Sequence, residues 1–167
     1  IITGETARKE NARQALSVLG EFAGDFVVTT AGPDLESLLA ARGAGADLYS
    51  EKTGKTVLHM DIGGGTSDIA VISLSGVVES ASIKVAGDQF NEAIVKYMRR
   101  KHNVLVGERT AELMKMEIGC VFPKEQETSI EIKGRCLVTG LPKVINVSST
   151  EMLEAFEEPV ERILEAI

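Results

Sequence analysis

The sequence has 167 residues, enough for one ordinary domain or two small lobes with a sizeable core. Hydrophobic residues make up 44% of it and charged residues 26%, which is typical of soluble globular chains. The formal net charge of −7 argues against general nucleic-acid binding, because such proteins need a clustered basic surface. We therefore expect a globular protein with no nucleic-acid partner.

The cysteines indicate the compartment of the protein, and the chain ends indicate whether the sequence is part of a longer protein. Cys120 and Cys136 lack the spacing of a zinc site and are too few for a disulfide scaffold, so we interpret both as reduced thiols of a cytoplasmic protein. No apolar run of about 18 residues could span a membrane. The chain begins with IITGETARKE and ends within the helical pattern VERILEAI, so we expect a piece of a longer protein.

The first third of the chain predicts alternating strands and helices. After a short apolar start, a helical period runs through GETARKENARQALSVLGEFAG and ends in a glycine. DFVVTTAG then predicts a buried strand, and PDLESLLAARGAGA predicts a helix that begins at Pro33 and ends at Gly43 and Gly45. This order indicates a βαβ arrangement with a parallel sheet.

From Thr56 onwards the pattern changes to consecutive strands. Three are predicted, in TVLHMDI, TSDIAVISLSG and VVESASIKVAG, and the glycines between them suit antiparallel hairpin turns. An amphipathic helix follows in DQFNEAIVKYMRRKH, with an apolar face of Phe90, Ile94, Val95 and Met98.

The remaining residues predict a mixed α/β pattern. GERTAELMKMEIG predicts a second helix, and TSIEIKGRCLVTGLPKVINV predicts short strands. SSTEMLEAFEEPVERILEAI predicts a final helix that begins behind a serine or threonine cap.

The stretch DIGGGTSD places three consecutive glycines after a strand. Backbone N–H groups can hold a phosphate where the chain turns without Cβ atoms, and Gly63, Gly64 and Gly65 allow this approach. Thr66 adds a hydroxyl donor, and Asp61 is placed to hold hydrated Mg²⁺ or to orient an attacking water. The alternative is a glycine-rich hairpin capped by an aspartate. The stretch is neither a Walker A loop, since no Lys-Ser/Thr pair follows, nor a dinucleotide fingerprint, since a hairpin follows.

The segment DIGGGTSDIAVI resembles the second phosphate loop of the actin-like ATPases. From about residue 60 to the end, with motifs such as IKGRCLVTGLPKVINVSSTEMLEAF, the chain is similar to the MreB family, the bacterial actins that organise cell-wall synthesis. The resemblance implies an α/β actin-like ATPase (ribonuclease H-like) fold: one large-domain half with an inserted smaller subdomain. We expect residues 1–88 and 136–167 to form the core subdomain and residues 89–135 to form the insertion.

Residues 1–58 resemble a different family. IITGETARKENARQALSVLGEFAGDFVVTTAGPDLESLLAARGAGADLYSEK is similar to EutA, the reactivating factor of ethanolamine ammonia-lyase. Both families share the actin-like fold and the DIGGGT loop. We therefore interpret the sequence as a hybrid joined near residues 55–65.

The resemblance implies a site for ATP and Mg²⁺. Asp61 matches the aspartate associated with Mg²⁺, and Gly63, Gly64, Gly65 and Thr66 match the phosphate cradle. Glu36 occupies the place of the residue that positions the hydrolytic water. The alternative for Glu36 is a first-turn glutamate favoured by the helix dipole.

Two further positions complete the expected site. Glu112 and Lys115 lie three apart on one helical face, and the resemblance sets them against the ribose and adenine. The alternative is an exposed ion pair that contributes little. Gly87 would let the backbone approach the nucleoside, against the alternative of a plain strand-to-helix turn with Asp88 as its cap.

The resemblance leads to three functional hypotheses. The main one is the nucleotide-binding part of an MreB-type cytoskeletal ATPase that self-associates into filaments and acts in cell shape. An alternative is part of an EutA-type ATP-dependent reactivase with ethanolamine ammonia-lyase as partner, and a third is an interaction module without turnover. The other loops of the actin-like cleft are missing, so we expect ATPase activity in the full-length parent and little in this chain alone.

Overall fold

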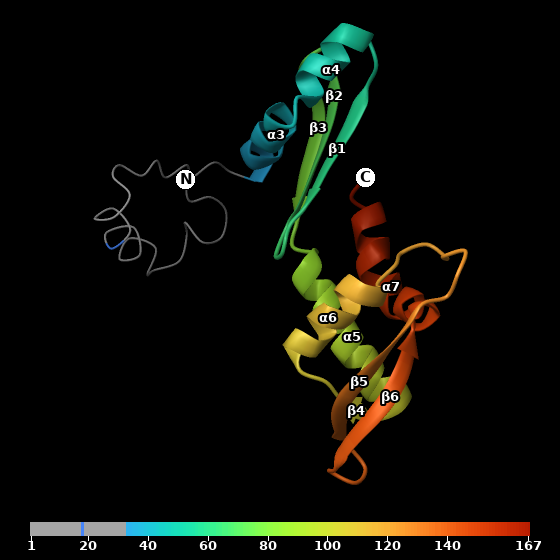
Figure 1. Ribbon diagram of the computed structural model, residues 1–167. Helices are drawn as coiled ribbons and strands as arrows, with labels where there is room; N and C mark the ends of the chain where they lie inside the picture. Colours follow the sequence, from blue (N-terminus) through green and yellow to red (C-terminus); the bar gives the residue numbers. More distant parts are fainter. Residues whose placement is uncertain (1–17, 19–32) are drawn as a thin grey trace. The chain divides into compact units, whose positions relative to one another are not determined.

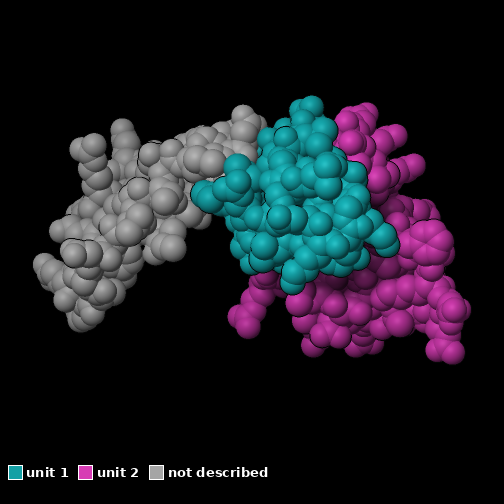
Figure 2. Space-filling view, turned by 90° about the horizontal axis from the view of Figure 1, so that it is seen from above, with its two compact units in different colours: residues 1–61, 68–82 teal, residues 62–67, 83–167 magenta. Residues whose placement is uncertain are grey.

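The computed structural model of the chain describes Val18 and residues 33–167, with side chains from Ser37 onwards in the continuous part (Figure 1). Apart from Val18, the elements predicted before residue 33 lie outside the described residues. The chain forms two units, coloured separately in Figure 2. Unit 1 comprises the residues up to Asp61 together with Asp68–Ser82, and unit 2 comprises Ile62–Ser67 together with Ile83–Ile167. The subdomain boundaries expected from the sequence stay a prediction.

The described residues of unit 1 form two helices and a three-stranded sheet, and each strand extends by one residue into unit 2 (Figure 1). The helices are α3 (Pro33–Gly43) and α4 (Ala46–Thr53). The sheet has the order β1-β2-β3, with β1 (Val57–Ile62), β2 (Ser67–Ser73) and β3 (Gly76–Ile83). Its small core joins both helices to the sheet through Ala41, Ala46, Ala70 and Ile72, with Val57 packed against them.

The two helices α3 and α4 begin and end at or beside proline or glycine residues. Helix α3 begins at Pro33 and ends at Gly43, as predicted. Helix α4 was not predicted, and it is flanked by glycines in the left-handed conformation, Gly45 (φ 76°) and Gly54 (φ 67°). The buried Ser50 hydroxyl donates to the carbonyl of Lys55 (2.7 Å) and accepts the N–H of Leu74 (2.9 Å), which holds α4 to the β2–β3 turn.

The β2–β3 turn differs from its prediction in one respect. Its two central residues are Leu74 (φ 48°) and Ser75 (φ 65°), both in the left-handed region that a two-residue hairpin requires. The glycine on which the prediction relied, Gly76, is instead the first residue of β3. The hairpin forms without a glycine at its positive-φ positions.

Unit 2 combines three helices with an antiparallel sheet of order β4-β5-β6 (Figure 1). The elements in chain order are α5 (Gly87–His102), β4 (Val104–Leu105), α6 (Glu108–Ile118), β5 (Ser129–Cys136), β6 (Pro142–Ser148) and α7 (Ser149–Leu164). In the β5–β6 register, Ser129 faces Ser148 and Ile132 faces Ile145. The two-residue strand β4 approaches β5 closely, because a Cβ atom on Gly134 would lie 2.8 Å from the carbonyl oxygen of Leu105.

The core of unit 2 confirms the predicted apolar face of α5. Ile94 and Met98 are fully buried, and Phe90 and Val95 pack against the same cluster. Complete burial of one such side chain contributes roughly 1.5–3 kcal/mol. The cluster includes residues from every other element of the unit: Val104, Ala111, Met114, Ile132, Val147, Met152 and Phe156.

Polar contacts also join α5 to α7. The Tyr97 hydroxyl donates to Glu154 Oε2 (2.7 Å), and Lys101 Nζ lies 3.4 Å from the same oxygen. His102 Nε2 lies 2.5 Å from Glu151 Oε1, whose other carboxylate oxygen accepts the N–H of the N-cap residue Ser148. The basic residues Arg99, Arg100, Lys101 and His102 occupy the last turn of α5, and the last two of them make these contacts.

Candidate glycine-turn site

The glycine turn lies between β1 and β2 and belongs to unit 2. The Gly63 N–H donates to the carbonyl of Thr66 (2.9 Å), which closes the turn. The carbonyls of Gly63 and Gly64 accept the N–H groups of Gly87 (3.0 Å) and Asp88 (2.8 Å), the first two residues of α5. These bonds hold the turn against the start of this helix, where N–H groups would otherwise lack partners.

The turn leaves two backbone donors free. Within the described part of the chain, the N–H groups of Gly64 and Gly65 donate to no partner, and both residues are exposed. Neither glycine has a positive φ, so backbone strain does not require glycine here. A Cβ atom on either residue would instead enter open space, with only a carboxylate oxygen of Asp88 at 3.9 Å. These two free donors are the groups with which the turn can hold an anion.

Gly87 is a position of close approach between the turn and both neighbouring helices. A Cβ atom there would lie 3.2 Å from Lys115 Nζ and 3.3 Å from the carbonyl oxygen of Gly63. The sequence predicted a close backbone approach at this glycine, and the approach observed in the chain is to the turn itself. A role toward a nucleoside stays a prediction.

Lys115 brings α6 to the same place. Its ammonium group donates to the carbonyl of Gly87 (3.2 Å), and its side chain is partly buried. Glu112, one turn earlier on α6, is exposed and forms no ion pair with Lys115 or with any other described residue. The exposed Glu112–Lys115 ion pair, which was the alternative interpretation, is therefore not formed.

Ser67 supports the turn and was missed by the sequence reasoning. Its side chain is fully buried, and its hydroxyl donates to the carbonyl of Val85 (2.5 Å), just before α5. Asp88 was likewise considered only as a helix cap, although its carboxylate stands beside Gly64 and Gly65. The signal that could have found Ser67 is its place on the buried, alternating face of β2.

Two predicted site residues belong to unit 1, so they are described apart from the turn. Asp61 is exposed near the end of β1, with Ile62 between it and Gly63 in the chain. Glu36 lies in the first turn of α3, and its side chain is outside the described residues. The next residue, Ser37, is fully buried and donates to Asp68 Oδ1 (3.4 Å) in β2. The structure thus brings together the turn, Gly87 and Lys115.

Comparison with known proteins identifies the family. The MreB/Mbl protein family matches residues 9–167 of the chain. The chain belongs to the MreB/Mbl family. The cell shape-determining protein MreB of Escherichia coli (strain K12) is 48% identical over 132 residues, which cover 79% of this chain and 37% of that protein. Mbl of Bacillus subtilis (strain 168) is 47% identical over 131 residues, covering 78% of this chain and 38% of that protein.

Solved structures of similar proteins have the same fold. MreB5 of Spiroplasma citri bound to AMPPNP is 36% identical, with a TM-score of 0.68, over 95% of this chain and 47% of that one. The MamK double helical filament, at 20% identity and a TM-score of 0.55 over 93% of this chain and 55% of that one, is similar in fold alone. This MreB/Mbl chain therefore has the expected actin-like fold, and it spans well under half the length of the curated relatives named above. None of the helices in the described residues could cross a membrane.

Proposed function

We propose that this chain is the nucleotide-binding part of an MreB-type cytoskeletal ATPase that acts in bacterial cell shape in the cytoplasm. The observation that carries the proposal is the pair of free N–H groups on Gly64 and Gly65, held against the start of α5. Backbone donors next to a helix N-terminus form an anion site suited to the phosphates of ATP. The family membership supports the same function, as does the nucleotide in the S. citri structures, which were solved with AMPPNP and with ADP.

The proposal gives each residue of the turn a role. The phosphates of ATP accept from the N–H groups of Gly64 and Gly65 and from the hydroxyl of Thr66. Lys115 supplies positive charge beside the turn, and Glu112, on the same helix, is placed toward the ribose and adenine. The contact of Lys115 with the Gly87 carbonyl couples the two parts of the site.

Mg²⁺ and hydrolysis depend on residues that the parent protein must bring together. No group of three or more His, Cys, Asp or Glu side chains in the described part of the chain could enclose a metal ion. Mg²⁺ in nucleotide sites commonly rests on one or two carboxylates, phosphate oxygens and water, and Asp61 is the carboxylate that we assign. We assign Glu36 to positioning the attacking water. Such catalysis consists mainly of positioning and charge neutralisation, which needs both halves of a cleft.

Self-association into filaments is part of the proposal. The turn between β5 and β6 carries the exposed apolar residues Leu137, Val138 (79% exposed) and Leu141 (65% exposed). Neighbouring exposed apolar side chains on a surface turn favour a protein contact. We propose that this hairpin tip contributes to assembly of the parent protein. The comparisons bear only on the MreB-type function, so the ethanolamine ammonia-lyase reactivase stays a prediction from residues 1–58.

The proposal is tested by thermal melts of this chain and of its full-length parent, with and without millimolar Mg²⁺-ATP. A ligand that binds only the folded state raises the midpoint, by about 2.7 kcal/mol of stability at a hundredfold excess over Kd. We expect a clear rise in the parent and a smaller rise in the chain alone. A parent that folds cooperatively and shows no rise with ATP would overturn the proposal.

A further inference from the structure

An apolar groove of about 450 Å³ lies along α7 in unit 2, beside the loop that follows α6. Leu164 of α7 is 64% exposed and Val121 of the loop is 60% exposed, so large apolar side chains stand in water here. Neighbouring apolar side chains left in water favour a protein contact. The apolar lining of this α7 groove consists of Val121, Leu153, Phe156, Val160 and Leu164.

The charged residues of the α7 groove all carry the same sign. They are Glu154, Glu157 and Glu161, which are spaced by three and four residues and therefore lie along one side of α7. All three are exposed. Lys101 lies 3.4 Å from Glu154, whereas Glu157 and Glu161 form no ion pair with a described residue. The groove therefore favours an apolar segment that brings positive charge.

The β5–β6 hairpin carries the complementary features on the same chain. Its tip, residues 137–141, exposes Leu137, Val138 and Leu141. Residues 132–148 contain no acidic residue, and three exposed basic residues flank the tip: Lys133, Arg135 and Lys143. The Arg135 guanidinium lies over the turn, because a Cβ atom on Gly140 would be 3.8 Å from its Nη2. The tip is therefore an apolar segment with positive charge beside it.

The tip and the α7 groove lie at opposite ends of unit 2 (Figure 1). Strand β6 begins at Pro142 next to the tip, and it ends about 20 Å away, at the rise of a β-strand, where α7 begins and continues away from the tip. A chain therefore cannot place its tip in its own groove. The tip can reach the groove of a second copy.

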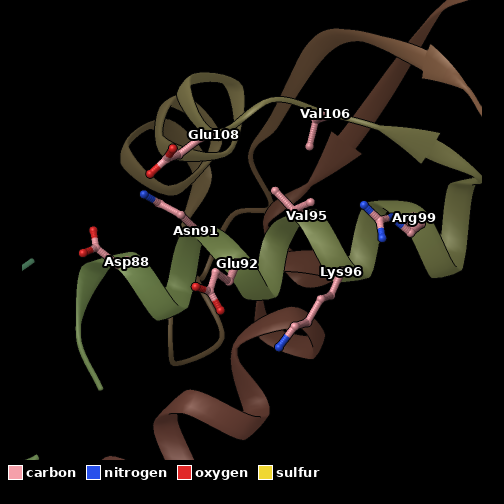
Figure 3. A pocket seen from close by; sticks show the side chains of 8 residues that line it. All are labelled: Asp88, Asn91, Glu92, Val95, Lys96, Arg99, Val106 and Glu108. Carbon is pink, nitrogen blue, oxygen red and sulfur yellow. The ribbon is translucent and has the colours of Figure 1, made fainter. Parts of the chain in front are cut away.

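A different groove in unit 2, of about 620 Å³ along α5, does not match the tip (Figure 3). Its lining has two apolar side chains, Val95 and Val106. Both signs of charge line it, through Asp88, Glu92, Lys96, Arg99 and Glu108. A basic apolar segment would meet like charge there, so the α7 groove is the better receptor for the tip.

We propose that the hairpin tip of one chain docks in the α7 groove of a second copy. The inference rests on the self-association in the proposed function and names the two surfaces that meet. The apolar residues of the tip pack on the apolar lining, and the basic residues beside the tip lie against the free carboxylates of Glu157 and Glu161. Each copy keeps one free tip and one free groove, so the contact repeats along an open chain of subunits.

Variants of the 167-residue chain test this contact by sedimentation velocity without nucleotide. Val138→Asp disables the tip, and Glu157→Lys with Glu161→Lys reverses the charge of the groove; Leu164→Glu is a second groove variant. A contact of this size is weak, so concentrations up to roughly 1 mM are compared. We expect the average mass of wild type to rise with concentration and each variant to stay monomeric. An equal mixture of a tip variant and a groove variant should form a dimer and nothing larger, because one intact tip meets one intact groove.

A matched control separates the groove from net charge. Glu117→Lys with Glu131→Lys changes the charge equally at exposed positions outside the groove, so this variant should associate like wild type. Circular dichroism and Tm confirm that each variant is folded. A monomeric wild type, association of the tip or groove variants alone, or a mixture that stays monomeric would overturn the proposal. These outcomes are independent of the ATP melts: a chain that associates as expected while its parent ignores ATP overturns the proposed nucleotide function and leaves this contact in place.

Discussion

The Tyr97 hydroxyl donates a 2.7 Å hydrogen bond to Glu154 Oε2 and thereby joins α5 to α7. Tyr97 is 2% exposed, and this burial is the main cause that raises the pKa of its phenol, followed by the hydrogen bond to Glu154. The same bond, followed by the charge of Lys101, holds the pKa of Glu154 below its usual range. The pair therefore stabilises the folded chain while Glu154 is ionised.

We expect Tyr97→Phe to lower Tm at neutral pH by roughly 2–4 °C, the effect of losing one buried hydrogen bond. A carboxylate with a depressed pKa gives stability above its unfolded pKa, about 4.3, and loses it as pH falls through the folded value. The Tm difference between wild type and Tyr97→Phe should therefore be full at pH 7 and shrink below about pH 4. Melts across this range measure it, and a difference independent of pH would contradict the coupling.

Gly87→Ala should weaken the nucleotide response. The new methyl group would lie 3.2 Å from Lys115 Nζ and 3.3 Å from the Gly63 carbonyl, so the turn, Lys115 or both must shift. We expect the rise in Tm with Mg²⁺-ATP to fall by half or more in the full-length parent. Gly107→Ala is the matched control at the start of α6, because a Cβ atom there meets nothing within 4 Å. Equal responses in both variants would remove Gly87 from the site.

Asp61→Asn should abolish the Mg²⁺-dependent part of nucleotide stabilisation in the full-length parent. Asp61 is exposed, so its replacement should leave the melt without nucleotide within a degree or two of wild type. The measurement compares the rise in Tm with ATP in Mg²⁺ and in EDTA. If the variant still shows the full difference between these two conditions, Asp61 does not hold the ion.

Val138→Asp should impair assembly of the parent protein, because it places a charge on the apolar hairpin tip. Sedimentation with Mg²⁺-ATP should show at least a several-fold loss of pelleted protein, with ATP binding retained. Leu74→Asp is the control, since Leu74 is a comparably exposed apolar residue (72%) at a turn of unit 1. Normal pelleting of Val138→Asp would exclude the tip from the contact.

Cys136 should be a reactive thiol near neutral pH. Hydrogen bonds from the Thr139 hydroxyl, then from the Thr139 and Val138 backbone, lower the pKa of this thiol to about 7. Since the thiolate is the nucleophile, its rate of alkylation by iodoacetamide should rise with pH and reach half its maximum near pH 7. Thr139→Ala should move that midpoint upwards, and mass spectrometry of the modified peptide reports it. An unchanged midpoint would argue against the Thr139 bonds.

Local signals predicted much of the fold, and tertiary contacts decided the rest. Helix α3 and the strands β1–β3 were predicted because proline, glycine and alternating residues act over a few positions. Helix α4 escaped prediction because its buried residues are only Ala46 and the polar Ser50, which give no apolar period. Strand β4 is two residues long and owes its existence to pairing with Arg135 and Cys136 of β5.

The candidate site was predictable in composition but not in arrangement. Three adjacent glycines after a strand indicated a phosphate turn from the sequence alone. The bond between the Gly63 carbonyl and the Gly87 N–H joins residues 24 positions apart, and no local pattern encodes such a contact.

The chain crosses between the two units three times, after Asp61, after Ser67 and after Ser82. A protease cut at any one crossing therefore leaves two covalent links, so a single nick cannot release either unit. A fragment that begins at Ile83 would lose Ile62–Ser67, and with it the carbonyls that receive the first N–H groups of α5. The smallest continuous stretch that contains all of unit 2 is residues 62–167, which necessarily carries β2 and β3 with it. An exchange of modules between related chains therefore keeps both partners of this contact from one parent only if the join lies before Gly63 or after Asp88.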